Sequence, residues 1–407
     1  MITNAKLIDT IRILKVPKVI IRYIIMNFLD LITIKRLLLI VKEANVLDQY
    51  SKDFLVNANK GFDWNCGNGH LTVAKWLCSL GQMNIHADDE YSFRWTCKNG
   101  HLNVAKWLYS LDPLGQINIH AYDEYAFRWS CQNGHLTVAK WLCSLCQINI
   151  HVENEYAFRW SCENGHLNVA KWLCSLDHCQ TINIHADNEY AFRKSCQNGH
   201  LNVAKWLCSL GQINIHAKNE YAFRLSCHNG HLNVAQWLYF LGRVDVHVDN
   251  EYAFRWACCN GHLTVAKWLY SFGNVNIHAH DEHAFRCACS NGHLTAAKWL
   301  YSLGGLDIHA RDESAFELSC ESGHLAVAKW LYSLGNVDIH SDDNYALRWS
   351  RACGHKTVEQ WLLSLDKTDI GTVHKRFDMR MLMSMLTFIF TLIKVLIQSF
   401  IESLIDY

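Results

Sequence analysis

Side chains able to do chemistry lie close together in this sequence. The stretch HVENEYAFRWSCENGHLNVAKWLCSL, residues 151–176, combines histidine, cysteine, glutamate and tryptophan. Imidazole, thiolate and carboxylate groups serve as zinc ligands and as acid–base catalysts. The stretch is therefore either a metal or catalytic cluster or the interior of a repeated structure, and the spacing of its residues decides between the two.

The same residues recur with a fixed period. A Gly-His pair appears ten times, in steps of 31 or 34 residues, with its histidine at His70, His101, His135, His166, His200, His231, His262, His293, His324 and His355. We number these repeats 1 to 10. The period predicts a repeat array over residues 55–370, flanked by an N-terminal segment, 1–54, and a C-terminal segment, 371–407.

Each repeat has the pattern of two short helices. In repeat 4 a first helix is predicted over 154–164, Gly165 is expected to end it in a left-handed conformation, and a second helix follows from Leu167. An INIH run after the second helix predicts a short, extended finger. Two such helices bury little surface alone, so the repeats must stack.

Most of the potentially reactive side chains lie at positions that recur with the period of the repeat. A metal site needs ligands that converge on one point, whereas residues 31 positions apart occupy successive repeats, so we predict no metal, cofactor or catalytic site. Nine cysteines fill one column of the first helix and should be buried thiols: Cys66, Cys97, Cys131, Cys162, Cys196, Cys227, Cys258, Cys289 and Cys320. Five lie outside the columns, and redox chemistry is expected there if anywhere: Cys146, Cys179, Cys259, Cys287 and Cys353.

Other columns also have structural interpretations. The histidines of the Gly-His pair are expected to bond loop backbone, and all sixteen tryptophans are periodic, which predicts stacked packing. Glutamate and arginine four residues apart predict ion pairs at the start of the first helix, as at Glu189–Arg193. No His-Glu-x-x-His motif is present, and the chain is predicted not to be an enzyme.

The repeat resembles an ankyrin repeat. Tyr156-Ala157-Phe158-Arg159 stands where Thr-Pro-Leu-His is usual, Ser161-Cys162 replaces Ala-Ala, and Gly165-His166 matches directly. The phrase is similar to ankyrin arrays of large DNA viruses of amoebae, which would make this a viral protein of the host-cell cytoplasm. The resemblance implies an all-α solenoid that binds a partner protein through its concave face and finger tips.

Recognition should involve positions that vary between otherwise uniform repeats. One such column, placed on the finger, is our predicted partner-binding set: Asp88, Tyr122, Glu153, Asp187, Lys218, Asp249, His280, Arg311 and Asp342. Neutral drift of solvated side chains is the alternative. A second variable column ends the first helix: Lys98, Gln132, Glu163, Gln197, His228, Cys259, Ser290 and Glu321.

The N-terminal segment has two interpretations. It is either a helical cap for the first repeat or a module that resembles an F-box, which docks on the Skp-type adaptor of cullin–RING ubiquitin ligases. The residues that resemble the adaptor-binding motif are Pro17, Ile20, Ile21, Ile25 and Leu29. The second interpretation implies a substrate adaptor of a ubiquitin ligase.

The C-terminal segment is also open to two interpretations. Residues 381–405 are apolar and follow basic residues, which suits a tail anchor and a membrane-tethered scaffold. Lys394 falls in mid-span on a narrow polar stripe, which favours a capping helix instead.

Composition and charge bear on the class of partner and on the cellular compartment. Thirty-eight basic and thirty-eight acidic residues balance, so no basic field indicates nucleic acid. Charged residues interrupt the N-terminal apolar runs, which argues against a signal peptide, and eighteen cysteines without one suggest a reducing, cytoplasmic compartment.

Overall fold

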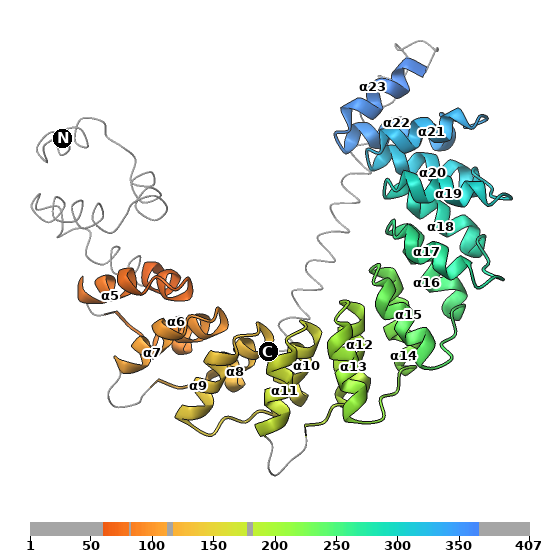
Figure 1. Ribbon diagram of the computed structural model, residues 1–407. Helices are drawn as coiled ribbons and strands as arrows, with labels where there is room; N and C mark the ends of the chain where they lie inside the picture. Colours follow the sequence, from red (N-terminus) through yellow and green to blue (C-terminus); the bar gives the residue numbers. More distant parts are fainter. Residues whose placement is uncertain (1–59, 81–82, 112–116, 177–181, 366–407) are drawn as a thin grey trace, which may run out of the picture. The chain divides into compact units, whose positions relative to one another are not determined.

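The computed structural model describes residues 60–80, 83–111, 117–176 and 182–365 (Figure 1). These residues form α-helices joined by turns, without a β-strand. The chain divides into two compact units, each described by itself: unit 1 is Met1–Ala257 with Thr264–Val275, and unit 2 is Cys258–Leu263 with Asn276–Tyr407. The predicted all-α repeat architecture is confirmed, and the INIH runs, predicted to be extended fingers, contain no β-strand and end in a turn.

Each repeat contributes a first and a second helix. Repeat 1 has helical residues 60–67, then α5 (Leu71–Leu80). The first helices of repeats 2–7 are α6 (Ala87–Lys98), α8 (Ala121–Gln132), α10 (Val152–Glu163), α12 (Ala186–Gln197), α14 (Ala217–His228) and α16 (Val248–Cys259). Their second helices are α7 (Leu102–Ser110), α9 (Leu136–Leu145), α11 (Leu167–Leu176), α13 (Leu201–Leu210), α15 (Leu232–Leu241) and α17 (Leu263–Tyr270).

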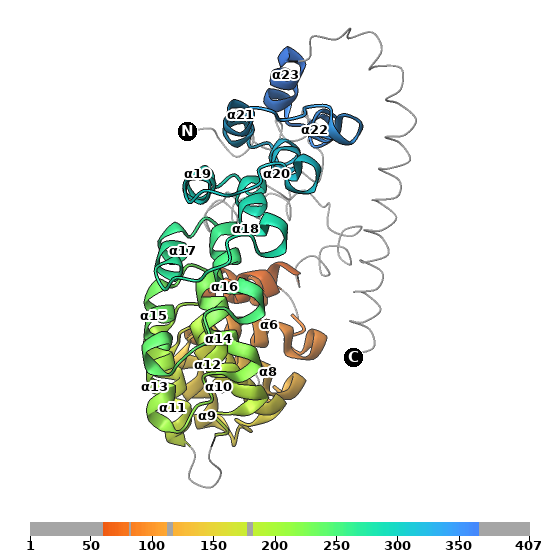
Figure 2. The same ribbon diagram turned by 90° about the vertical axis from the view of Figure 1, so that its right-hand side faces the viewer.

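Unit 2 continues the same pattern. Its helices are α18 (Ala279–Ser290), α19 (Leu294–Ser302), α20 (Ala310–Glu321), α21 (Leu325–Ser333), α22 (Ser341–Ala352) and α23 (Lys356–Leu365). Within each unit, the first helices of successive repeats pack side by side, α8, α10, α12 and α14 in unit 1 and α18, α20 and α22 in unit 2 (Figure 2).

The core is built from one apolar set that every repeat supplies. In repeat 4 these are Phe158 and Cys162 of the first helix with Val169 and Leu173 of the second, each at most 1% exposed. The phenylalanine also reaches the following repeat, where its ring centroid lies 6.2 Å from that of Trp206. The same contact recurs along the array, so the predicted packing of these tryptophans is confirmed.

The Gly-His turn joins the two helices and the next repeat. Gly199 has a φ of 80°, which favours glycine because other residues meet their own backbone there. A Cβ on Gly199 would also lie 2.6 Å from Nδ1 of His231, the turn histidine of repeat 6. Glycine is thus required at this position for two reasons. It allows the left-handed turn, as predicted, and it leaves room for the imidazole of the next repeat.

Candidate functional site

Among the described residues, no group of three or more histidine, cysteine, aspartate or glutamate side chains is arranged to hold a metal ion. The nine cysteines of the first-helix column are 0% exposed, as predicted. Burial raises the pKa of their thiols, to about 12 for Cys66, which keeps them protonated and unreactive. The interesting geometry lies instead where each first helix begins.

In repeats 2 to 10, three residues in the first turn of the first helix are in the left-handed conformation. In repeat 5, Asp187, Asn188 and Glu189 have φ values of 53°, 53° and 61°. A non-glycine residue pays roughly 1–2 kcal/mol to adopt this conformation. The same three positions are left-handed in repeats 2 to 10, so the predicted partner-binding set occupies this turn rather than a finger tip.

The helix that follows holds the turn in place. Nε of Arg193 donates to the carbonyl of Asn188 at 2.6 Å, and Nη2 donates to the carbonyl of Asp187 at 2.8 Å. Arginine is suited to this role because its planar fork presents two donors at once. The predicted Glu189–Arg193 ion pair is therefore wrong: the guanidinium binds backbone oxygens.

Glutamate has a different partner from the one predicted. Oε1 of Glu189 lies 2.9 Å from Nδ1 of His185 and also accepts the backbone N–H of Asn214 in repeat 6 at 3.2 Å. The left-handed turn points this carboxylate back toward the histidine and into the next repeat. Glutamate therefore links two repeats, which explains why it is buried at 7% exposure.

The variable side chains of the turn are exposed but not isolated. Glu153 is 48% exposed and lies 2.8 Å from Nη1 of Arg128 in the preceding repeat. Asp249 pairs with Arg224 in the same way at 3.0 Å. The ring of Tyr122 takes the place of a carboxylate, 4.3 Å below the guanidinium of Arg94.

Two members of this column are basic and pair differently. Lys218 lies 3.8 Å from Asp187, its counterpart in the preceding repeat. Arg311 lies 2.9 Å from Asp281, and both side chains are more than half exposed. Exposed pairs of this kind contribute about 0–1 kcal/mol each, so we expect these two pairs to add little to the stability of the fold.

Aromatic rings continue this surface along the first helices of unit 1. Tyr125 stacks on Trp129 with centroids 5.4 Å apart, and Tyr156 stacks on Trp160 at the same distance. The guanidinium of Arg128 lies over the Tyr156 ring at 4.7 Å, so arginine and tyrosine alternate from one repeat to the next. All four rings are half-buried.

These aromatic residues were missing from the predicted set. Periodicity indicated packing for every tryptophan, but Trp95, Trp129 and Trp160 of the first helices are only half-buried. One signal in the sequence could have identified these residues. The position that holds Trp95, Trp129 and Trp160 is occupied by Lys194, Leu225 and Cys287 in other repeats. A core position tolerates such changes poorly.

The second variable column contacts the following repeat. Nζ of Lys98 lies 4.0 Å from the Trp95 ring centroid and 3.9 Å from that of Trp129. Gln132 and Glu163 accept hydrogen bonds from the tyrosine hydroxyls of the next repeats, the latter from Tyr190 at 2.6 Å. The residues of this column therefore differ because each pair of neighbouring repeats is joined by a different side-chain contact.

The turn histidines also bond across repeats. His135 hydrogen-bonds the backbone at Lys98, in the preceding repeat, and His200 bonds that at Glu163. Desolvation lowers the pKa of both imidazoles, so they are held neutral. The expected bond to backbone is present, but its partner is the last residue of the preceding repeat's first helix and not a loop.

The predictions for the two ends of the chain fall outside the described residues. These are the cap or F-box of residues 1–54 and the cap or anchor of residues 371–407. Among the helices of the described part, none has the length and apolar character needed to cross a membrane.

The family model described as "Ankyrin repeats (3 copies)" matches the chain over residues 127–219, 158–250 and 223–312. No curated protein matches the sequence. The matches fall on the helix–turn–helix repeats and their Gly-His turns, and they agree with the all-α architecture. Residues 127–312 of this chain are ankyrin repeats.

Proposed function

We propose that the chain is a scaffold that binds a partner protein through the first-helix surface of unit 1. Ankyrin repeats in general serve as protein–protein interaction scaffolds, and this supports the class of function. The surface itself comprises Trp95, Trp129 and Trp160, their stacked tyrosines and arginines, and the exposed turn residues beside them.

The half-buried tryptophans carry this proposal. Tryptophan, tyrosine and arginine are the residues that most often dominate the binding energy of protein interfaces. Here they form one connected series, since Lys98 lies between Trp95 and Trp129, and Trp160 contacts Tyr190 of the next repeat at 6.0 Å. Their ordered rings would lose little conformational entropy on binding.

The turn column supplies a means of distinguishing partners. Its side chains differ in charge from repeat to repeat, and Asp187, Lys218 and Arg311 are 41–59% exposed. Exposed charges affect specificity and association rate more than affinity. The predicted residues that lie in unit 1 are therefore proposed as the rim of the surface rather than its centre: Asp88, Tyr122, Glu153, Asp187, Lys218 and Asp249.

A test on the tryptophans distinguishes this surface from the rest of the array. The partner is identified by affinity capture, and its dissociation constant for the chain is measured with purified proteins. Trp95→Ala, Trp129→Ala and Trp160→Ala together should weaken binding by at least about 100-fold. The control, Lys106→Ala, Lys140→Ala and Lys171→Ala, changes exposed second-helix residues of the same repeats. Equal effects of the two variants would reject the proposal.

The rim calls for a separate variant. Tyr122→Ala with Lys218→Ala should leave the melting temperature nearly unchanged and weaken binding by about tenfold or less. Unchanged affinity would assign the column to neutral drift, and a large loss of stability would assign it to packing.

Two finer functions rest on residues outside the described part of the chain. A substrate adaptor of a ubiquitin ligase requires that Pro17, Ile20, Ile21, Ile25 and Leu29 bind a Skp-type adaptor. Ile21→Asp with Ile25→Asp would then abolish capture of the adaptor while the array melts as before. A membrane-tethered scaffold requires that residues 381–405 hold the protein in membranes during carbonate extraction.

A further inference from the structure

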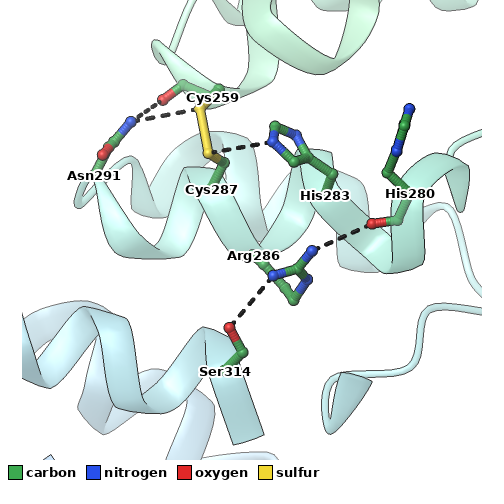
Figure 3. Close-up of a disulfide and its surroundings, with 7 residues drawn as sticks. All are labelled: Cys259, His280, His283, Arg286, Cys287, Asn291 and Ser314. Carbon is green, nitrogen blue, oxygen red and sulfur yellow. Dashed lines mark hydrogen bonds between the residues drawn. A yellow bond between two sulfur atoms is a disulfide. The ribbon is translucent and has the colours of Figure 1, made fainter. Parts of the chain in front are cut away.

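Two cysteines that depart from the repeat pattern lie together in unit 2. Cys259 ends α16, at the position held by Lys98 or Glu163 in other repeats, and Cys287 of α18 takes the position of Trp95 or Trp129. They form a disulfide with their Cα atoms 4.8 Å apart (Figure 3). This separation is within the ordinary range for disulfides. Both are among the cysteines outside the columns, where redox chemistry is expected if anywhere.

The repeat architecture explains why the two meet. In unit 1 the residue that ends one first helix contacts the tryptophan position of the next, as Lys98 contacts Trp129 at 3.9 Å and His228 stacks on Trp256 at 4.9 Å. Cysteine at both positions therefore places two sulfurs in a contact that the fold already makes. A chance surface pair would lack this built-in proximity.

The surroundings of the two sulfurs differ. Cys259 is 1% exposed, and its sulfur lies 3.5 Å from Nδ2 of Asn291. Cys287 is only half-buried, and its sulfur lies 4.0 Å from Nε2 of His283, one helical turn earlier (Figure 3). A small thiol reaches Cys287 more readily than Cys259, and an imidazole beside a sulfur favours its thiolate.

We propose that Cys259 and Cys287 form a reversible thiol–disulfide exchange site whose ligands are small thiols and their disulfides. The thiolate of a small thiol attacks Sγ of Cys287 and breaks the bond to Cys259, whose sulfur keeps the electron pair and takes up a proton. A second thiolate then attacks the external sulfur of the mixed disulfide. Cys287 leaves as a thiolate that is protonated beside His283, and the small disulfide departs. Oxidation by the small disulfide is the reverse sequence.

The bond has a mechanical consequence. It joins the end of α16 to the middle of α18, and it closes a loop over a sequence separation of 28 residues. His283 of α18 stands where Tyr125 and Tyr156 stand in unit 1. The covalent link restrains α18, so its reduction should loosen this helix.

Differential alkylation of the full chain tests the proposal. The protein is equilibrated in buffers of reduced and oxidised glutathione that span a cytosolic to an oxidising ratio, quenched and analysed by mass spectrometry. Cys259 and Cys287 should change together from alkylated to linked, while the nine column cysteines stay reduced. Amide exchange of α18, residues 279–290, should rise at least several-fold on reduction.

Three variants complete the experiment. Cys287→Ser should abolish the transition and give α18 the exchange rate of the reduced protein, whereas Cys353→Ser, at an exposed cysteine, should leave both unchanged. His283→Gln should slow exchange with glutathione several-fold near neutral pH and leave the equilibrium ratio nearly the same. The proposal is rejected if the pair stays reduced in every buffer, if it resists reduction in the folded protein, or if other cysteines link to the same extent.

Discussion

Units 1 and 2 share a backbone and differ in the side chains that join their repeats. In unit 1 each arginine of a first helix lies over the tyrosine of the next, as Arg159 lies 4.8 Å from the Tyr190 ring. In unit 2 the tyrosine becomes His283 and Ser314, and the arginine of repeat 9 becomes Glu317. The left-handed turns and the Gly-His turns nevertheless have the same dihedral angles in both units.

This difference separates what the fold requires from what it tolerates. Some contacts present in both units satisfy backbone groups: Glu313 accepts the N–H of Asp338, just as Glu189 accepts that of Asn214. The arginine–tyrosine contacts, which differ between the two units, involve only side chains. Backbone groups must be satisfied in every repeat, whereas a side-chain contact can be replaced by another of similar size.

The largest expected effect concerns the turn that both units share. Gly199→Val in unit 1 and Gly323→Val in unit 2 should each reduce the local free energy of unfolding by at least about 2 kcal/mol, because the residue is left-handed and the next imidazole occupies the Cβ position. Amide exchange resolved by repeat measures this loss.

Gly67→Ala is the matched control for these substitutions. Its Cβ would meet its nearest neighbour at 3.6 Å, an ordinary contact, so stability should be unchanged or slightly raised. A marked difference between the two valine variants would show that the turn is not equivalent in the two units.

The next effect concerns the arginine that holds the left-handed turn. Arg193→Ala removes both donors to the carbonyls of Asp187 and Asn188, and should cost about 1.5–3 kcal/mol. Arg193→Lys should recover only part of this, because an ammonium group lacks the planar fork. Chemical denaturation followed by amide exchange in α12 measures both. Full recovery by lysine would mean that charge, and not the pair of hydrogen bonds, stabilises the turn.

The smallest expected effect concerns Glu317, which in unit 2 takes the position of a first-helix arginine. Burial raises the pKa of this carboxyl to about 7, and the carboxylates of Asp342, Glu313 and Asp312 add to this, although a hydrogen bond from Ser341 opposes it. Between pH 4.5 and about 7 the folded protein keeps a proton that the unfolded chain loses. The stability of repeats 9 and 10 should therefore fall as pH rises through this window.

Glu317→Gln removes this dependence. At pH 8 it should stabilise α20 and α22 by about 1 kcal/mol, and near pH 4 it should have little effect. Amide exchange at the two pH values measures the gain. Repeat 8, which keeps Arg286 at the same position, provides the internal comparison and should be unaffected. A gain of equal size at both pH values would mean that shape, and not ionisation, is responsible.

The histidines of the Gly-His turns should make the array more stable as pH rises, in both units, which is the opposite of the effect of Glu317. Desolvation lowers the pKa of His200 in unit 1 and of His324 in unit 2 below the ordinary value of 6.5. The unfolded chain then binds more protons below that pH, so these histidines stabilise the array above pH 6.5 and their contribution is lost as pH falls.

The sequence by itself determined the repeat, its helices and its core. Period, apolar spacing and the Gly-His pair are local signals, and a column such as Phe158, Cys162 and Leu173 has the same environment in every repeat. The burial of nine cysteines followed from the period alone. The surface was predicted less well, because Glu189 and Arg193 four residues apart indicated an ion pair that the left-handed turn prevents.

Only the tertiary structure decided which variable positions face solvent and which face the next repeat. Residues such as Lys98 and Trp129, or Cys259 and Cys287, are 31 and 28 positions apart, and no local pattern brings them together. Their contact depends on how one repeat is rotated and shifted on the next. That geometry is set by the packing of whole helices. Because of it, a column that varies in sequence can be either a binding surface or a contact between repeats.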